Sequence, residues 1–233
     1  MRPTVVVPHR RRRDLLERAL RACEGWPVIV VDDTDDGLDL DVAKVRLGGG
    51  QGFARAANAG LAAARTPDAI LLNDDAVPLF DCLDRLARAG GLCGPMLVGP
   101  DGVESAGMRM RLWRPVQVRR GRVDALSGAC LHLPASARFD ERFRHGCEDV
   151  ELCLRLGGAR LVAEARCWHE GGATVDRRTP EAQRHAVAGQ LRLREPSWRD
   201  GVIVALNVAQ VVRERGPIGR IGAIADGWRD ARG

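Results

Sequence analysis

Three short apolar runs, each followed at once by polar residues, constrain the fold of this chain most. Between them, helical patterns cover Asp14–Cys23, where Asp14 could cap the helix, and Phe53–Arg65. Apolar strands that alternate with helices predict an α/β fold with a mostly parallel central sheet flanked by helices. Ligands of such sheets lie beyond the carboxyl ends of the strands, so we expect the polar clusters to share one edge. The runs and the clusters that follow them are Thr4–Pro8 with His9–Arg13, Pro27–Val31 with Asp32–Asp36, and Ala69–Leu72 with Asn73–Asp75.

The rest of the chain carries weaker patterns. Gly90–Gly102 is rich in glycine and proline, which indicates irregular backbone. The apolar residues of Val202–Val212 are too closely spaced to form a clean amphipathic stripe, and this spacing favours a buried helix. The remaining expected elements are a short strand at Val42–Leu47, strands within Val116–Arg122 and Ala125–Leu133, helices at Glu148–Leu156, Pro180–Arg194 and Pro196–Arg215, and a Gly-rich end.

Composition and charge argue against several classes of protein. No apolar run among the 233 residues approaches the ~20 that a membrane-spanning helix needs, and the first residues lack a signal-peptide pattern, so we expect a cytoplasmic protein. The formal net charge is +5, of which residues 176–233 carry +4. That tail could lie against an anionic membrane, close the site or form a homodimer. Aromatic residues make up only 4% of the chain, and the charge is not concentrated, so nucleic acid is not expected as a partner.

Two further features are weak signals for a site. The seven cysteines are odd in number and form no C-x-x-C pair, so reduced thiols in the core fit better than zinc or disulfides. The glycine string at Gly48–Gly52 fits the dinucleotide pattern G-x-G-x-x-G in no frame. Its backbone N–H groups can still meet a phosphate or a ribose.

Acidic residues mark two candidate centres. Asp32–Asp33 and Asn73–Asp75 end two strands of the expected sheet, and such oxygen ligands suit Mg²⁺ or Mn²⁺ on a nucleotide. Glu148–Asp149 opens a helix, where the helix dipole stabilises negative charge, as a general base requires. Trp168 and His169 could provide an acceptor platform and a metal ligand.

Seven segments in chain order resemble the family-2 glycosyltransferases of the GT-A fold, particularly their rhamnosyltransferase-like branch. The resemblance covers roughly residues 3–175. It implies a catalytic domain at 1–175, with a nucleotide-sugar-binding half at 1–100 and an acceptor half at 101–175, and a helical extension at 176–233 packed on the same domain. The segments are Val5–Pro8, Val30–Gly37, Gly50–Gly60, Leu71–Asp75, Ser127–Cys130, Phe139–Phe143 with Glu148–Arg155, and Trp168–Gly172.

The resemblance also implies roles for individual residues. Asp75 would ligate Mg²⁺ or Mn²⁺ on the donor diphosphate, with His169 close by, although Asn73 replaces the first acid of the family's Asp-x-Asp motif. Asp149 would be the catalytic base and Glu148 its acidic neighbour. The donor-binding residues would be Pro8, Asp32 and Asp33 at the base and ribose, Arg55 and Asn58 on the donor, and Asn73 and Asp74 near the ribose or sugar. Ser127, Gly128 and Trp168 would face the acceptor or the sugar.

The reaction implied is transfer of a hexose or deoxyhexose from a UDP- or dTDP-sugar to an acceptor hydroxyl, with inversion at the anomeric carbon. The acceptor stays open between a glycan, a lipid-linked sugar and a small natural product. Two alternatives also stay open. A sugar nucleotidyltransferase usually has a basic Gly-rich loop after its first strand, and His9–Arg13 is basic without glycine. A non-catalytic nucleotide- or sugar-binding module would leave Glu148–Asp149 incidental.

Overall fold

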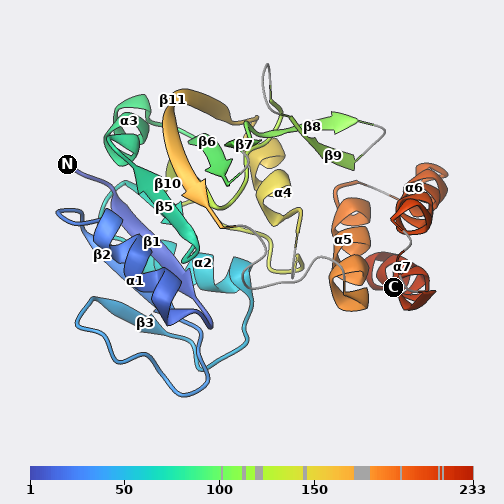
Figure 1. The fold of residues 1–233 in the computed structure, drawn as a ribbon, viewed down its shortest axis with the longest axis horizontal. Coiled ribbons are helices and arrows are strands. Elements are labelled where there is room, and N and C mark those ends of the chain that lie inside the picture. Colours follow the sequence, from blue (N-terminus) through green and yellow to red (C-terminus); the bar gives the residue numbers. More distant parts are fainter. Residues whose placement is uncertain are drawn as a thin grey trace.

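The computed structural model describes residues 1–100, 102–111, 114–118, 123–143, 146–170, 179–194, 196–214, 216 and 218–232 (Figure 1). Three of the expected features reach beyond these residues. They are positions 119–122 of the expected strand Val116–Arg122, the end of the expected helix at Arg215, and Gly171 and Gly172 of the last family-like segment.

The first half of the chain forms the parallel sheet that the apolar runs predict. The central strand β1 pairs in parallel with β2 and with β4, and β2 pairs in parallel with β3. Asp14 does not cap the first helix, because the cap position is Arg12 and Asp14 lies in the first turn. The elements are β1 (Thr4–His9), α1 (Arg13–Ala22), β2 (Val28–Asp32), β3 (Lys44–Arg46), α2 (Phe53–Ala63) and β4 (Asp68–Leu72).

The second half extends this sheet with mixed pairing. In the described part of the chain the sheet has nine strands in the order β3-β2-β1-β4-β10-β6-β11-β5, with β7 paired to β6. Strand β6 corrects the expectation of irregular backbone for Cys93–Gly99, which lies between β10 and β11. The elements are β5 (Ala76–Leu79), α3 (Cys82–Ala89), β6 (Cys93–Gly99), β7 (Gly102–Ser105), β8 (Met108–Arg111), β9 (Arg114–Gln117), β10 (Cys130–Pro134), α4 (Glu148–Arg155) and β11 (Arg160–His169).

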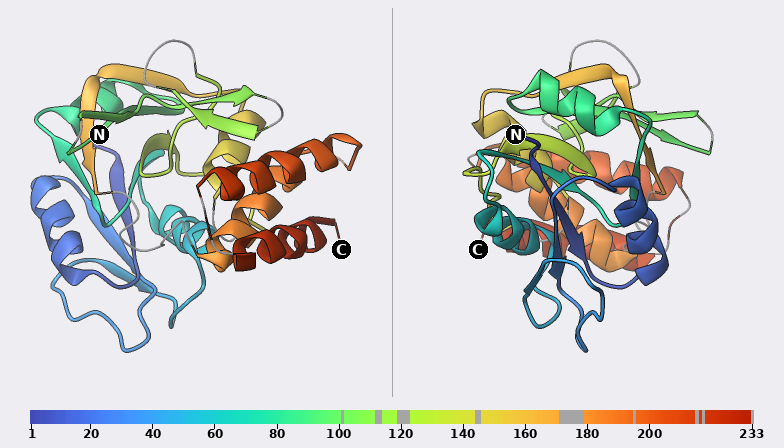
Figure 2. Two further views of the ribbon diagram at one scale, coloured as in Figure 1. Left: turned by 45° about the vertical axis from the view of Figure 1, so that its right-hand side comes forward. Right: turned by 90° about the vertical axis from the view of Figure 1, so that its left-hand side faces the viewer.

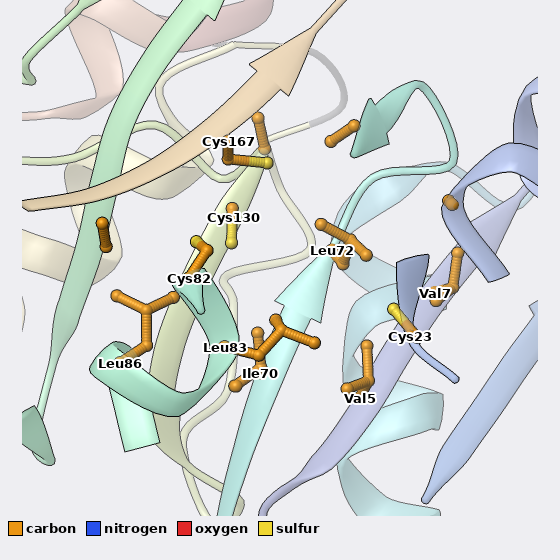
Figure 3. Packing of buried hydrophobic residues seen from close by; sticks show 14 of the residues in the cluster. Val5, Val7, Cys23, Ile70, Leu72, Cys82, Leu83, Leu86, Cys130 and Cys167 are labelled. Carbon is orange, nitrogen blue, oxygen red and sulfur yellow. The ribbon is translucent and has the colours of Figure 1, made fainter. Parts of the chain in front are cut away.

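The sheet buries apolar side chains on both faces. Val5 and Ile70 point to one face, where Leu16 of α1 packs, while Val6 and Leu71 point to the other face. Alternating residues of each strand thus belong to different cores, as the pleat requires. All seven cysteines are buried and free, as expected, and Figure 3 shows Cys82, Cys130 and Cys167 within the first of these cores.

Helix α2 lies unusually close to the sheet at Gly60. A Cβ atom at this position would come within 2.2 Å of Val6 Cγ1 and 2.7 Å of Val31 Cγ2. Only glycine allows this approach, which brings the start of α2 close to the ends of β1 and β2.

Three helices follow the sheet and form a separate apolar cluster (Figures 1 and 2). The expectation of a fully buried helix at Val202–Val212 is wrong, because α6 buries only Asp200, Ile203, Asn207 and Val211 and leaves Val212 62% exposed. The Gly-rich end of the chain forms the helix α7. Gly227 allows this helix to lie against the backbone of Arg184 in α5. No helix of the described residues is long and apolar enough to cross a membrane. The helices are α5 (Pro180–Arg192), α6 (Arg199–Arg213) and α7 (Ile218–Arg232).

Candidate active site

The three polar clusters lie at one edge of the sheet, as the parallel topology requires. Strand register pairs His9 with Asp32, and the backbone N–H of Asp33 donates to the carbonyl of His9 at 2.9 Å. Pro8 is buried and pairs with Val31. The sequence therefore located the edge correctly, although it gave no role to His9.

His9 binds Asp74, the first acid of the Asn73–Asp75 cluster. Its Nδ1 lies 2.6 Å from Asp74 Oδ2, and both residues are buried. This contact fixes the end of β1 to the end of β4 across the edge. Asp74 thus has a protein partner in addition to its expected place near the ribose or sugar, which stays a prediction.

Asp75 is the best candidate for a metal ligand. Its Oδ1 is buried and receives no hydrogen bond from a described residue, and it lies 3.5 Å from Nε2 of His169. Antiparallel pairing of β5 with β11 sets His169 opposite Ala76, and the N–H of Glu170 donates to the carbonyl of Asp75 at 3.0 Å. The side-chain oxygen of Asn73 is also buried and receives no hydrogen bond from the described chain.

These residues fit a divalent cation that also binds a substrate. Among the described residues, no group of three or more His, Cys, Asp and Glu is placed to hold a metal ion by itself. Mg²⁺ in particular is usually held by one or two carboxylates together with substrate phosphates. Because Oδ1 of Asp75 receives no hydrogen bond from a described residue, it is compatible with an ion that a diphosphate helps to bind.

Asp32 and Asp33 are engaged within the protein. Asp32 accepts hydrogen bonds from the hydroxyl of Thr34 at 2.6 Å and from the N–H of Leu38 at 2.8 Å. Burial alone would raise the pKa of Asp32, but these bonds outweigh burial and lower it. The carboxylate of Asp33 accepts from the backbone N–H of Gln51 at 3.0 Å, and so holds the loop that opens α2. Contacts of either acid with a nucleotide stay predictions.

The two residues on α2 that are expected to bind the sugar donor differ in how the protein holds their side chains. Arg55 is exposed, and its guanidinium donates to Gln51 at 2.9 Å. The side chain of Asn58 instead donates to the carbonyl of Phe139 and accepts from its N–H, at 3.0 and 2.8 Å, and donates to Glu141. Asn58 thus fixes the segment that leads to α4, a role that its sequence position did not reveal.

Asp149 is held at the start of α4 by the Ser127–Cys130 segment. Its Oδ2 accepts from the N–H of Gly128 at 2.9 Å. A Cβ atom on Gly128 would lie 3.4 Å from the Cβ of Asp149, which is an ordinary van der Waals contact, so the two residues pack directly together. Ser127 accepts from Ala129 through its hydroxyl, and the carbonyl of Ala129 accepts from the N–H of Asn73 at 2.9 Å. One short segment therefore contacts both Asp149 and the Asn73–Asp75 cluster.

Glu148 differs from its neighbour in its environment. Its Oε2 is buried and receives no hydrogen bond from a described residue. Burial, together with the adjacent Asp149 carboxylate, raises the pKa of Glu148 to about 8. The preceding residue, Cys147, has a φ of +70°, a left-handed conformation that costs energy for a side chain with a Cβ. Strain of this kind is frequent at functional sites.

Trp168 lies beside His169 on β11. It is half-buried, pairs with Val77 and Val98 on the two neighbouring strands, and its Nε1 has no hydrogen-bond acceptor among the described residues. A contact of its indole with acceptor or sugar stays a prediction.

Known structures share this arrangement of strands and helices. S. aureus TarS aligns over 92% of this chain and 43% of its own, with 14% identity and a TM-score of 0.57. The mannosyltransferase PcManGT from Pyrobaculum calidifontis, in complex with GDP-Man and Mn²⁺, aligns over 99% of this chain and 86% of its own, with 14% identity and a TM-score of 0.55. The fold is GT-A. A further GT-A structure, S. aureus TarS 1-349 in complex with UDP, aligns over 92% of this chain and 72% of its own, with 15% identity and a TM-score of 0.52.

Sequence comparison adds a family match within the first half of the chain. Residues 4–90 match the sequence model of glycosyl transferase family 2. None of the curated protein sequences matches this chain. The matched segment runs from β1 to α3 and includes Asp75, whereas Asp149 lies beyond it. This chain spans less than half the length of full TarS.

Proposed function

We propose that this chain is a family-2 glycosyltransferase that moves a hexose or deoxyhexose from a nucleoside-diphosphate sugar to an acceptor hydroxyl, with inversion at the anomeric carbon. The observation that carries the proposal is the Ser127–Cys130 segment. It hydrogen-bonds to Asp149 through Gly128 and to the Asn73–Asp75 cluster through Ala129. A candidate base and a candidate diphosphate site thus belong to one connected unit.

Asp149 is the proposed general base. The N–H groups of Gly128 and Val150 donate to its carboxylate, and the dipole of α4 favours negative charge at this helix start. Glu148 stays protonated at neutral pH because of its raised pKa, so the pair carries its single negative charge on Asp149. A carboxylate with this charge can take the proton of the acceptor hydroxyl as the oxygen attacks.

The donor diphosphate is proposed to lie at the edge formed by β1, β2 and β4. Asp75 and His169 would hold Mg²⁺ or Mn²⁺ there, and such an ion, when bound, neutralises charge on the departing diphosphate. Arg55 is exposed at the start of α2 and can reach a phosphate. The proposed nucleotides are UDP and dTDP. The relatives of known structure hold UDP and GDP-Man, so a GDP-sugar belongs in the same assay.

The test is release of nucleoside diphosphate from UDP-, dTDP- and GDP-hexoses in the presence of Mn²⁺ or Mg²⁺. Asp149→Asn should abolish transfer to an added acceptor and leave donor binding, measured by calorimetry, nearly unchanged. The matched control is Glu151→Gln, which removes only an exposed pair with Arg155 on the same helix. Normal turnover by the Asp149→Asn variant would remove this residue as the base.

A second variant addresses the cation. Asp75→Asn should weaken metal-dependent donor binding, whereas Asp84→Asn, at an exposed position on α3, should not. Undiminished metal-dependent affinity in Asp75→Asn would exclude the proposed ligand. Release of pyrophosphate from a nucleoside triphosphate and a sugar 1-phosphate would favour a nucleotidyltransferase. Donor binding without any turnover would favour a binding module.

A further inference from the structure

A second arginine-rich stretch, besides Arg10–Arg13, lies outside the proposed donor site and outside the tail. Between Met108 and Val123 the sequence has six arginines and no acidic residue. Because the whole chain has a net charge of +5, this segment alone exceeds the surplus of the entire protein. The six are Arg109, Arg111, Arg114, Arg119, Arg120 and Arg122.

The basic tail differs, because many of its arginines are neutralised. Arg184 binds Asp230, Arg232 binds Asp200 and Arg220 binds Glu214. Several positive charges of the tail are therefore compensated by acidic residues of its own helices. The tail offers less concentrated charge to a partner than the sequence total suggests.

Two strands at the start of this segment, Met108–Arg111 and Arg114–Gln117, form an antiparallel sheet that we call the β8–β9 hairpin. Figures 1 and 2 show that it extends from the main body on the side of α4. Met108 is buried against Val150 and Cys153 of α4, whereas Arg109 and Arg111 are exposed. One face of the hairpin thus packs on the protein and the other presents arginines to solvent.

These exposed arginines lack the usual partners. Neither Arg109 nor Arg111 forms an ion pair or hydrogen bond with a described residue. The first acid that follows the segment, Asp124, accepts a hydrogen bond from the N–H of Met110. An anionic partner would supply the negative charge that Arg109 and Arg111 lack among the described residues.

The hairpin is held firmly at its base. The N–H of Ala106 donates to Val118, and the N–H of Met108 donates to Ala125, both at 2.8 Å. Gly107 has a φ of +110°, and a Cβ atom there would lie 2.7 Å from Val123. The arginines are therefore presented on an ordered support, so binding does not first have to order the backbone of these strands.

We propose that the β8–β9 hairpin binds the headgroup layer of an anionic membrane. Arginines here alternate with apolar residues, and in the sequence the strands are joined by Leu112-Trp113. Basic clusters attract anionic lipids, and tryptophan is enriched at the membrane interface. A nucleic-acid surface would be expected to interleave polar residues that reach bases and phosphates. The proposal goes beyond the proposed function, and its test does not require catalysis.

The test is co-sedimentation of the full chain with vesicles of phosphatidylcholine alone or mixed with phosphatidylglycerol. Binding should require phosphatidylglycerol and weaken as salt is added, because salt screens surface charges. Arg109→Gln with Arg111→Gln should weaken binding roughly fivefold for each arginine, or about 30-fold together. The charge-preserving Arg109→Lys with Arg111→Lys should retain binding.

Arg21→Gln with Arg65→Gln is the matched control, since both positions are exposed and the loss of charge is equal. Equal loss of binding in the control, or unchanged binding in the hairpin variant, would overturn the proposal. Equal binding to pure phosphatidylcholine would do the same. Binding of a duplex oligonucleotide that depends on Arg109 and Arg111, without vesicle binding, would assign the surface to nucleic acid. Nucleoside diphosphate release by the same variants reports separately on the proposed function.

Discussion

Gly189 of α5 lies directly against the carbonyl oxygen of Gly146. A Cβ atom at position 189 would come within 2.5 Å of that oxygen and 3.2 Å of Cys147 Cβ. Gly146 and Cys147 immediately precede Glu148 and Asp149, so a C-terminal helix contacts the backbone that positions the proposed base. The helical extension thus has a structural part in the proposed site, whatever its part in acceptor choice.

Gly189→Ala should impair transfer more than it impairs folding. The added methyl must push α5 or the Gly146–Cys147 backbone aside, and misplacement of a base by about 1 Å can reduce rate by roughly 100-fold. The control is Gly222→Ala on α7, where nothing lies within 4 Å of the new Cβ. That change should stabilise the protein by about 0.5–1 kcal/mol. Turnover and urea unfolding of both variants check the prediction, and unchanged turnover in Gly189→Ala would contradict it.

Asn58→Ala should lower the free energy of unfolding by about 1–3 kcal/mol, because it leaves the N–H and carbonyl of Phe139 without their partner. Urea denaturation measures this change. Asn58→Asp keeps the oxygen that accepts from the N–H of Phe139, so it should lower the free energy of unfolding by less. Weaker donor binding with unchanged stability would show instead that Asn58 acts on the donor, as the family resemblance implies.

His9→Ala should destabilise the edge of the sheet, since Asp74 loses its 2.6 Å partner while buried. The expected loss is about 1–3 kcal/mol. Arg12→Ala removes an exposed pair with Asp14, which solvent screens, and should change stability far less. Thermal unfolding of the two variants side by side tests the difference, and equal losses would show that the buried contact has no special weight.

Glu148→Gln should make stability less dependent on pH. The folded pKa of Glu148, at about 8, lies above its ordinary value of 4.5, so folding favours the protonated form. Its stabilising contribution is present below about pH 4.5 and is lost as pH rises toward 8. A tenfold change in proton affinity corresponds to about 1.4 kcal/mol. Relative to the variant, the wild type should therefore lose a few kcal/mol of unfolding free energy between pH 5 and 8. Parallel pH profiles for both proteins would contradict this assignment.

The sequence predicts the first half of the fold because its strands are buried on both faces. Thr4–His9 and Asp68–Leu72 are almost continuously apolar, and the polar clusters after them mark the ligand edge without ambiguity. Strand β11 gives no such signal, since Arg160, Glu164 and Arg166 interrupt its apolar residues while backbone pairing holds it. Helix α7 is also hidden, because its glycines lower helix propensity and tertiary packing against α5 compensates.

Some residues of the candidate site could likewise be proposed from the sequence, and others could not. Asp75 and Asp149 could be proposed from the sequence because carboxylates at a strand end and at a helix start have a recognisable chemistry. His9 and Asn58 could not, since their partners Asp74 and Phe139 are 65 and 81 residues away. The only signal for His9 is its place as the last residue of an apolar strand.

The burial of every native thiol has a practical consequence. None of the seven cysteine residues exposes more than 9% of its surface, so the folded protein should react slowly with a thiol-specific dye. If a cysteine replaced Arg109 or Arg65, a thiol-reactive fluorophore would then label almost only this introduced residue. The folded chain is ready for single-site spectroscopy without first removing its own sulfhydryls, and a sudden gain in dye uptake would report the moment at which the core opens.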